Sequence, residues 1–184
     1  MVSKVERDRK EIVMNHTETS ILVVGICGSL RAVSYTCMAV EVALQGAQEI
    51  GAQTRLIALR DYELVFCGGK EDESTYPEDV FRLRREVEQA QGIILGTPEY
   101  HGSFSGVLKN ALDLMGFAEF EGKMVGLVGV SGGGMGAVNA LNSLRAVARA
   151  RYMPGQCRNR PRALPHGKPL MRLANPKPSN RKKG

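Results

Sequence analysis

The fold is decided by a stretch near the N-terminus, ILVVGICGSLRAVSYT (residues 21–36). Its opening run, ILVVGI (21–26), is short and β-branched, which is typical of a strand buried on both faces of a sheet. A loop rich in glycine and serine follows, and a helical pattern extends from about Tyr35 to Ile50. The predicted apolar stripe of this helix is Val40, Ala43, Leu44, Ala47 and Ile50, with Gly51 as the C′ residue.

The same alternation of strand and helix continues along the chain. Further strands are predicted at 54–59, 92–97 and 124–130, and further helices at 78–91, 106–116 and 137–150. Pro98 is expected to end the third strand, and residues 61–77 fit neither period and are predicted to form a long surface loop. Strands that alternate with helices imply right-handed crossovers and a parallel sheet between helical layers. The predicted fold class is therefore three-layer α/β.

Composition excludes several classes of protein. The 184 residues are 43% hydrophobic, which supports one domain with its own core and excludes a wholly disordered chain. No apolar stretch approaches the roughly 20 residues of a membrane span, and the charged first twenty residues do not form a secretory signal. The four cysteines, Cys27, Cys37, Cys67 and Cys157, form no CxxC pair. We therefore expect free, reduced thiols and a cytoplasmic protein without a membrane partner.

The net charge of +6 is divided unevenly along the chain. Residues 151–184 hold ten basic side chains, no carboxylate and six of the eight prolines, whereas the preceding 150 residues carry a net charge of −4. We expect a polar N-terminal extension (1–20), a folded domain (21–156) and a Pro/Arg-rich tail (157–184). A basic tail can bind nucleic acid or an anionic membrane. A solvated end explains the same composition more simply, so we do not expect a nucleic-acid partner.

Three loops follow predicted strands, at the edge of an α/β sheet where ligands bind. The first, residues 25–36, offers the hydroxyls of Ser29, Ser34 and Thr36, the guanidinium of Arg31 and the N–H groups of a helix start. No carboxylate occurs from residue 21 to residue 40, so nothing there repels a phosphate. The alternative is that Ser34 or Thr36 is a simple N-cap and Arg31 a surface charge.

The second loop, TPEYHGSFSG (97–106), combines a rigid proline, a flexible glycine and polar and aromatic groups, as a loop at the edge of a flat heterocycle would. His101 is either a general acid or only a hydrogen-bonding group. Glu99 is expected to accept hydrogen bonds from nearby backbone N–H groups. Tyr100 fits a ligand contact or a subunit interface equally well.

The third loop, SGGGMGA (131–137), lets the backbone approach a ligand closely. Gly132, Gly134 and Ala137 formally match the Rossmann pattern G-x-G-x-x-G/A. That pattern requires an acidic residue about 20 positions later, and the chain has no Asp or Glu after Glu121. The match also follows the fourth predicted strand rather than the first. We therefore exclude a Rossmann dinucleotide site.

Together, GSLRAVSYT (28–36), TPEYHGSFSGVLKNALD (97–113) and VSGGGMGA (130–137) resemble the NADPH-dependent FMN reductase family of flavodoxin-like proteins. The resemblance covers about residues 21–156. It implies a flavodoxin-like sheet of order 2-1-3-4-5. It also implies hydride transfer from NADPH (or NADH) through FMN to a small-molecule electron acceptor: a flavin, quinone, azo dye or metal oxyanion. A flavin-binding electron carrier or redox sensor is the alternative, and the only mildly acidic domain favours the enzyme.

The resemblance also implies which residues touch the cofactor. The FMN phosphate would be held by Ser29, Arg31, Ser34, Tyr35 and Thr36. The isoalloxazine ring would be edged by Pro98, Glu99, Tyr100 and His101, with Gly102 permitting the turn, and its other side would face Ser131, Gly132, Gly133 and Gly134. No catalytic acid or base and no metal site is expected, because the flavin performs the chemistry.

The last expectation concerns assembly and the C-terminal segment. Relatives are homodimers or homotetramers, and residues 106–116 with Tyr100 would form the contact, although Leu108, Leu112 and Met115 fit a core equally well. Relatives also continue into a last strand-flanking segment and a helix, where this chain becomes rich in Pro and Arg. If that helix is absent, apolar area on one sheet face stays uncovered, which predicts lowered stability or self-association.

Overall fold

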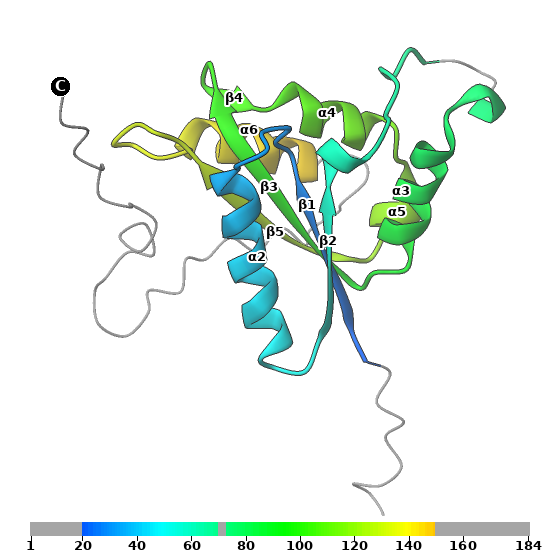
Figure 1. Cartoon of the computed structure of the whole chain (residues 1–184), viewed down its shortest axis with the longest axis horizontal. Helices are drawn as coiled ribbons and strands as arrows, with labels where there is room; N and C mark the ends of the chain where they lie inside the picture. The colour runs from blue at the N-terminus through cyan, green and yellow to red at the C-terminus, as the bar shows by residue number, and fades with distance from the viewer. Residues whose placement is uncertain (1–19, 70–72, 150–184) are drawn as a thin grey trace, which may run out of the picture.

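The computed structural model describes residues 20–69 and 73–149, which form one sheet with helices on both faces (Figure 1). The strands are β1 (Leu22–Cys27), β2 (Gln53–Ala58), β3 (Gly92–Tyr100), β4 (Ser103–Phe104) and β5 (Met124–Val130). The helices are α2 (Tyr35–Gln48), α3 (Glu78–Glu88), α4 (Gly106–Asp113), α5 (Phe117–Phe120) and α6 (Val138–Arg149). Short 3₁₀ turns lie at Leu59–Asp61 and Glu73–Thr75.

The sheet confirms the predicted architecture. Strands β2, β1, β3 and β5 lie side by side in that order and are parallel, while the two-residue β4 pairs antiparallel with the end of β3. This order corresponds to the first four positions of the flavodoxin-like order 2-1-3-4-5. Four expectations concern residues outside the described part of the chain. They are a fifth parallel strand beyond β5, the last helix, the N-terminal extension as far as residue 19 and the tail 157–184.

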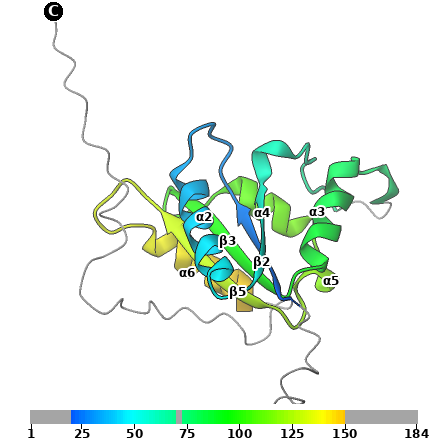
Figure 2. The same cartoon turned by 60° about the horizontal axis from the view of Figure 1, so that its bottom comes forward.

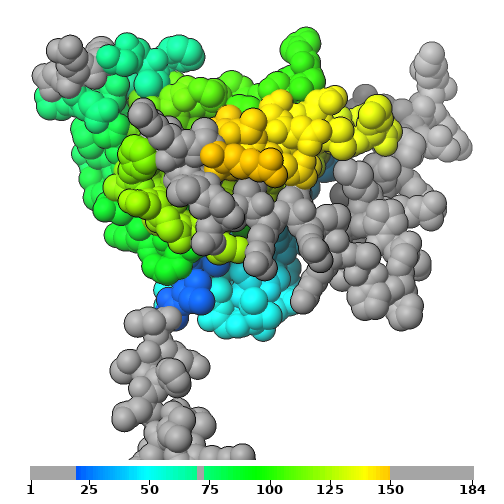
Figure 3. All heavy atoms as spheres, turned by 180° about the vertical axis from the view of Figure 1, so that it is seen from behind, coloured from blue at the N-terminus to red at the C-terminus, as the bar shows by residue number. Residues whose placement is uncertain are grey.

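The main hydrophobic core lies between the sheet and helices α3, α4, α5 and α6. Figure 3, seen from behind, shows α6 on the outside of this layer. Strand residues that point to this face alternate with residues that point away, as the pleat of a strand requires. The core members on the strands are Val24, Ile26, Ile57, Ile93, Leu95 and Val125, and those on the helices are Leu83, Val87, Leu108, Ala111, Leu112, Phe120, Leu144 and Ala148.

Helix α2 packs on the opposite face, as the layered view of Figure 2 shows. It approaches the sheet closely because two strand positions beneath it are glycines. A Cβ at Gly25 would lie 2.9 Å from Leu44 Cδ1, and a Cβ at Gly96 would collide with Val40. Because Gly25 and Gly96 have no side chains, α2 packs directly on β1 and β3. This packing positions the loop that precedes the helix.

Of the helices that the structure describes in residues 20–69 and 73–149, α2 is the one that packs on the second face of the sheet. Met124 is 45% exposed, and Val128 and Ile94 are only half-buried. Met38 and Val42 of α2 are also exposed. The expectation that one sheet face lacks its last helix falls on residues outside the described part of the chain and stays a prediction.

Two expectations about local structure are wrong, and two short elements were not predicted. Helix α2 ends at Gln48, so Ile50 is 86% exposed rather than part of the apolar stripe, and Gly51 follows with a φ of +94°. Strand β3 continues through Pro98, because a proline at the last parallel register, opposite Val130, costs the ladder at most one hydrogen bond. The short elements α5 and β4 have too few residues to show a period.

The apolar residues of α4 and of the segment just after it settle one alternative that the sequence left open. Leu108, Leu112 and Met115 are at most 8% exposed and belong to the main core. They therefore stabilise the domain itself and cannot form the expected subunit contact. Within the described part of the chain, no helix has the length and apolar character needed to cross a membrane.

Substitution of Gly96 by alanine should destabilise the protein, because the new methyl group collides with Val40 beneath α2. We expect the free energy of unfolding to fall by about 1–3 kcal/mol in chemical denaturation. Gly46→Ala is the matched control, because Gly46 lies inside α2 with open space around the position of a Cβ. The control should stabilise the protein by about 0.5–1 kcal/mol. Equal effects of the two substitutions would contradict this account of the helix packing.

Candidate cofactor site

The three loops singled out in the sequence begin at the same edge of the sheet. Cys27 pairs in register with Gly96, and Pro98 pairs with Val130, so the carboxyl ends of β1, β3 and β5 are neighbours. We call residues 28–34 the β1 loop, residues 98–105 the β3 hairpin and residues 131–137 the glycine-rich loop. Parallel strands place such loops around a common crevice, where ligands bind in open α/β sheets.

The β1 loop leads into the N-terminus of α2. Ser34 is the N-cap residue, and its Oγ accepts a hydrogen bond from the Cys37 backbone N–H at 3.2 Å. Helix geometry leaves the N–H groups of Tyr35 and Thr36 without intrahelical acceptors. The first turn of the described helix contains no acidic residue. The helix dipole and these donors make this turn suitable for an anion.

Side chains from distant segments hold the backbone of the β1 loop in place. The guanidinium Nη1 of Arg60 donates to the carbonyl oxygens of Arg31 and Ala32, at 3.2 and 2.7 Å. The buried Ser105 hydroxyl donates to the Gly28 carbonyl oxygen at 2.6 Å, and the Gly28 N–H donates to the Gly96 carbonyl at 2.8 Å. With three of its carbonyls bound elsewhere, the loop is fixed in shape.

A disulfide joins the two ends of this segment and corrects the expectation of free thiols. Cys27, the last residue of β1, is bonded to Cys37 in the first turn of α2, with 5.3 Å between their Cα atoms. The sequence did not predict this disulfide, because the two cysteines are ten residues apart and meet only where the chain returns into α2. Of the described cysteines, Cys67 is free, and Cys157 lies outside the described residues.

The β3 hairpin turns at two residues with positive φ, His101 (+50°) and Gly102 (+75°). Two consecutive residues in this region are what a two-residue type I′ connection requires, and glycine adopts it without strain. The turn joins β3 to β4, with Glu99 opposite Phe104 and Tyr100 opposite Ser103. His101 therefore lies at the exposed tip of a hairpin, and its contact with a flavin stays a prediction.

Neighbouring side chains at the end of β3 point to different sides of the strand. Tyr100 lines a cavity next to the β1 loop. Glu99 is turned toward α6, where its Oε2 accepts a hydrogen bond from the Ala140 N–H at 3.0 Å and its Oε1 one from Asn139 Nδ2 at 3.4 Å. Strand alternation explains the separation. The Glu99 carboxylate is thus an acceptor for backbone N–H, and its side chain does not line the cavity.

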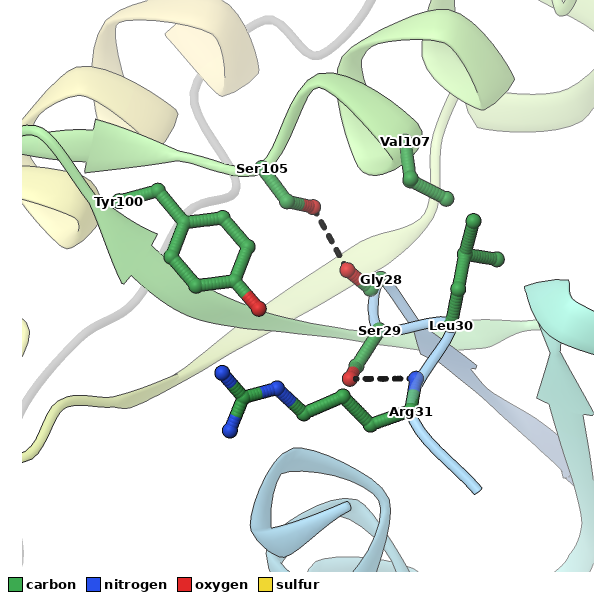
Figure 4. Close-up of a pocket in the computed structure, with 7 residues that line it drawn as sticks. All are labelled: Gly28, Ser29, Leu30, Arg31, Tyr100, Ser105 and Val107. Atoms are coloured by element: carbon green, nitrogen blue, oxygen red, sulfur yellow. Dashed lines mark hydrogen bonds between the residues drawn. The ribbon is translucent and has the colours of Figure 1, made fainter. Parts of the chain in front are cut away.

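The cavity beside the β1 loop has a volume of about 300 Å³ (Figure 4). It is lined by Gly28, Ser29, Leu30, Arg31, Tyr100, Ser105 and Val107. Figure 4 shows the Tyr100 hydroxyl directed toward the Arg31 guanidinium. Ser29 Oγ accepts a long, 3.4 Å hydrogen bond from the Arg31 N–H, which leaves its O–H group able to donate. None of these seven described lining residues carries a carboxylate.

A close approach of backbone segments forms the floor of this cavity. A Cβ at Gly28 would lie 2.7 Å from Leu108 Cβ and 2.9 Å from the Gly96 carbonyl oxygen, so no larger residue fits. The cationic side chain of Arg31, the Ser29 hydroxyl and the aromatic ring of Tyr100 line the cavity beside it. This donor set fits the phosphate of a flavin nucleotide, and the tyrosine ring offers an apolar surface to its heterocycle.

The glycine-rich loop connects β5 to α6. The Gly136 N–H donates to the Gly133 carbonyl at 3.0 Å, and Gly136 has a φ of +65°. The Gly133 N–H donates to Ser131 Oγ at 3.3 Å. Gly132, Gly133 and Gly134 are exposed. The structure thus places this loop at the same edge as the other two, and it does not line the cavity.

Sequence reasoning missed several residues that shape the site. Ser105 and Arg60 hold the β1 loop, and Gly28, Leu30 and Val107 line the cavity. A signal for Ser105 was present, since a serine one residue before a predicted helix is a typical N-cap, and its Oγ does accept from the Leu108 N–H. Arg60 carried no such signal, because its partners lie 28 and 29 residues away in the chain.

A parallel sheet of order β2-β1-β3-β5 with a carboxylate-free loop before its first helix is the arrangement of a flavodoxin-like α/β protein. The family model described as "NADPH-dependent FMN reductase" matches residues 21–159. The chain belongs to this family of FMN-dependent, NAD(P)H-oxidising enzymes, and its resemblance to the family, inferred from the three motifs, is confirmed.

Individual relatives agree with this assignment. An "NAD(P)H-dependent FAD/FMN reductase" from Geobacillus thermodenitrificans is 33% identical over 136 residues, which cover 71% of this chain and 72% of that protein. An "FMN-dependent NADPH-azoreductase" from Staphylococcus saprophyticus is 40% identical over 72 residues, which cover 39% of this chain and only 38% of that protein.

Solved structures give the same result. The apo form of an NADH:FMN oxidoreductase superposes with a TM-score of 0.61 and 26% identity, over 73% of this chain and 70% of that one. A flavoenzyme NAD(P)H:(acceptor) oxidoreductase from Paracoccus denitrificans superposes with a TM-score of 0.56 and 28% identity, over 69% and 70% of the two chains.

Replacement of Ser105 by alanine should loosen the site and weaken the domain. The change removes the donor to the Gly28 carbonyl and the cap of α4 together, so we expect a loss of about 1–2 kcal/mol in the free energy of unfolding. Ser103→Ala, in the half-buried β4, is the control and should change stability by less than about 0.5 kcal/mol. Thermal and chemical denaturation of both variants measure the difference. A Ser105→Ala protein as stable as the control would show that neither bond contributes.

Proposed function

We propose that this enzyme passes reducing equivalents from NADPH (or NADH), through FMN bound at the β1 loop, to a small-molecule acceptor. The carrying observation is the carboxylate-free cavity in which Arg31, Ser29 and Tyr100 converge beside the N-terminus of α2. Flavins, quinones, azo compounds and metal oxyanions form the proposed acceptor class.

The phosphate of FMN would be held by the β1 loop and the first turn of α2. Arg31 supplies the positive charge, and the helix start supplies N–H groups and the positive end of a dipole. Ser29, Ser34 and Thr36 are at most 4% exposed, so their hydroxyls lie inside the loop, whereas Tyr35 is 49% exposed. Thr36 also packs its methyl group toward Gly96, which makes it a structural element of the same turn.

The ring system of FMN would lie between the β3 hairpin and the glycine-rich loop. The ring would be edged on one side by residues 98 and 100–102 and by the backbone of Glu99, and residues 131–134 would follow the other side. The Tyr100 side chain would face the ring from the cavity, and the backbone of Pro98 to Gly102 would provide polar groups at its edge. FMN, when bound, supplies the hydride acceptor and donor.

This chain's own residues bind and orient the reactants. We assign no catalytic acid or base to a side chain. Among the described residues, His101 is the histidine at this edge and lies at the hairpin tip, and the Glu99 carboxylate is already bonded to α6. The protein's contribution is therefore positioning and a fixed electrostatic environment. An open crevice at which the donor and the acceptor bind in turn is consistent with broad acceptor specificity and ping-pong kinetics.

The relatives support the acceptor class without selecting one member. One is named for the reduction of FAD and FMN, and another for azo compounds. A structural neighbour with 13% identity and a TM-score of 0.55, an NAD(P)H:quinone oxidoreductase from Methanothermobacter marburgensis, shares the fold alone. Because these names differ among proteins of one fold, the acceptor must be determined by direct assay.

We also propose that the enzyme works in the cytoplasm as a homodimer or homotetramer. NADPH and FMN are kept inside cells, which supports the location. The Cys27–Cys37 disulfide is compatible with a reducing compartment only if thiols cannot reach it, and these residues are 0% and 6% exposed. The exposed apolar side chains of Met38 and Val42 on α2 support assembly. Sedimentation of the purified protein would decide the oligomeric state.

Charge reversal at Arg31 tests the phosphate site. Arg31→Glu places a carboxylate in the cavity, and we expect the dissociation constant for FMN to rise by about 100-fold or more. Arg55→Glu, on the exposed side of β2, is the control for the change in net charge and should bind normally. Quenching of flavin fluorescence on titration with protein measures both constants. Unchanged affinity of Arg31→Glu would refute the assigned phosphate site.

The reaction itself is tested by anaerobic mixing of the FMN-loaded protein with NADPH. We expect rapid bleaching of the flavin absorbance near 450 nm, because the family's chemistry begins with hydride transfer to the cofactor. Addition of a quinone, an azo dye or chromate should then restore the yellow colour, and the fastest acceptor identifies the preferred substrate. A loaded protein that stays yellow in NADPH would refute the proposed reaction.

A further inference from the structure

Glu99 connects two of the three loops of the site. It lies on β3 next to the hairpin turn, and its two carboxylate oxygens reach residues 40 and 41 positions later in the chain. Oε2 accepts from the Ala140 N–H at 3.0 Å, and Oε1 accepts from Asn139 Nδ2 at 3.4 Å. Both partners belong to the first turn of α6, which directly follows the glycine-rich loop.

Helix α6 needs an acceptor at this end and has none of its own. The first N–H groups of a helix lack intrahelical partners, and the N-terminus carries a partial positive charge. The residue before α6 is Ala137, whose side chain cannot accept a hydrogen bond, and the described first turn of the helix contains no acidic residue. No carboxylate occurs anywhere in the chain after Glu121. Glu99 therefore supplies from another strand the cap that the local sequence lacks.

This cap determines where the glycine-rich loop ends. The loop begins after Val130, which pairs in register with Pro98 of β3. It ends at α6, whose first turn is bonded to Glu99 of the same strand. A segment with four glycines among seven residues has many accessible conformations. Its average position therefore depends on how firmly its two ends are held, and β3 holds both.

We propose that Glu99 is a positioning residue that fixes the glycine-rich loop relative to the β3 hairpin, and so sets the width of the flavin crevice. The proposal rests on the proposed function, since it assigns a role in cofactor binding. It differs from a catalytic role for the carboxylate. Glu99 acts through α6 and the loop, while Tyr100, its neighbour on the other side of the strand, lines the cavity.

The first test measures the loop in the FMN-free protein, so that it does not depend on activity. Glu99→Ala should increase amide hydrogen exchange in residues 131–141 by about tenfold, because the acceptor of Ala140 is lost. Glu99→Gln keeps one amide oxygen as an acceptor and should show a smaller increase. Glu41→Ala, which removes an exposed carboxylate of α2, is the matched control and should leave this segment unchanged.

The second test separates positioning from catalysis. In Glu99→Ala we expect the dissociation constant for FMN to rise by about tenfold. At saturating FMN, kcat should stay within about threefold of the unsubstituted value, and its pH profile should keep its shape. Glu99→Gln should restore most of the affinity. A general acid or base would instead lower kcat by about 100-fold or more in both variants and remove one limb of the pH profile.

The outcomes distinguish this proposal from the proposed function. Exchange in residues 131–141 that is unchanged in Glu99→Ala would overturn the positioning role, whatever the protein binds. Loss of kcat in both variants at saturating FMN would also overturn it, in favour of a catalytic carboxylate. Failure of the unsubstituted protein to bind FMN, with exchange in the variants altered as expected, would overturn the proposed function and confine Glu99 to holding the loop.

Discussion

The close approach of the β1 loop to β3 and α4 is the constraint on which the rest of the site depends. The glycine at position 28 lets the backbone lie against the Gly96 carbonyl and Leu108, and the buried Ser105 hydroxyl fastens it there with a 2.6 Å hydrogen bond. The same serine caps α4 and donates its own N–H to Thr97 Oγ1. One residue, through its side chain and its backbone N–H, thus joins the first loop, β3 and the helix after the hairpin.

Side chains from other elements complete this framework. Arg60, just after β2, binds two carbonyls of the β1 loop, and Glu99, on β3, binds the first turn of α6. In each case a residue on a strand, or just after one, forms hydrogen bonds with a segment that follows a different strand. Such hydrogen bonds make a binding site built from loops more rigid. A rigid site loses less conformational entropy when a ligand binds.

The two faces of the sheet have different consequences for the molecule. The face under α3, α4, α5 and α6 carries the main core, whereas α2 alone covers the other face within the described residues. Exposed apolar residues such as Met124 and Val42 would stabilise the protein if they were buried, because removal of apolar surface from water is favourable.

Much of the fold was predictable from local pattern. The strand at 124–130 was predicted with both ends correct, and the ends of the other long elements were predicted within a few residues. Buried strands and amphipathic helices can be predicted because each has a characteristic pattern of apolar residues. The errors occur where a local rule was overruled. Pro98 stays in a strand because its missing N–H falls at the end of a ladder, and Ile50 is exposed because α2 ends before it.

The class of fold, the three loops and the absence of negative charge around the first loop follow from the amino-acid sequence, because they depend on neighbouring residues and on composition. The groups that hold the loops become visible in the folded chain: Arg60 on the β1 loop, Ser105 on Gly28, Glu99 on α6 and Cys27 on Cys37. Each of these pairs is separated by many residues along the chain. Hydrogen bonds and disulfides require their atoms to be close in space. The local pattern of residues does not indicate which distant residues the folded chain brings together.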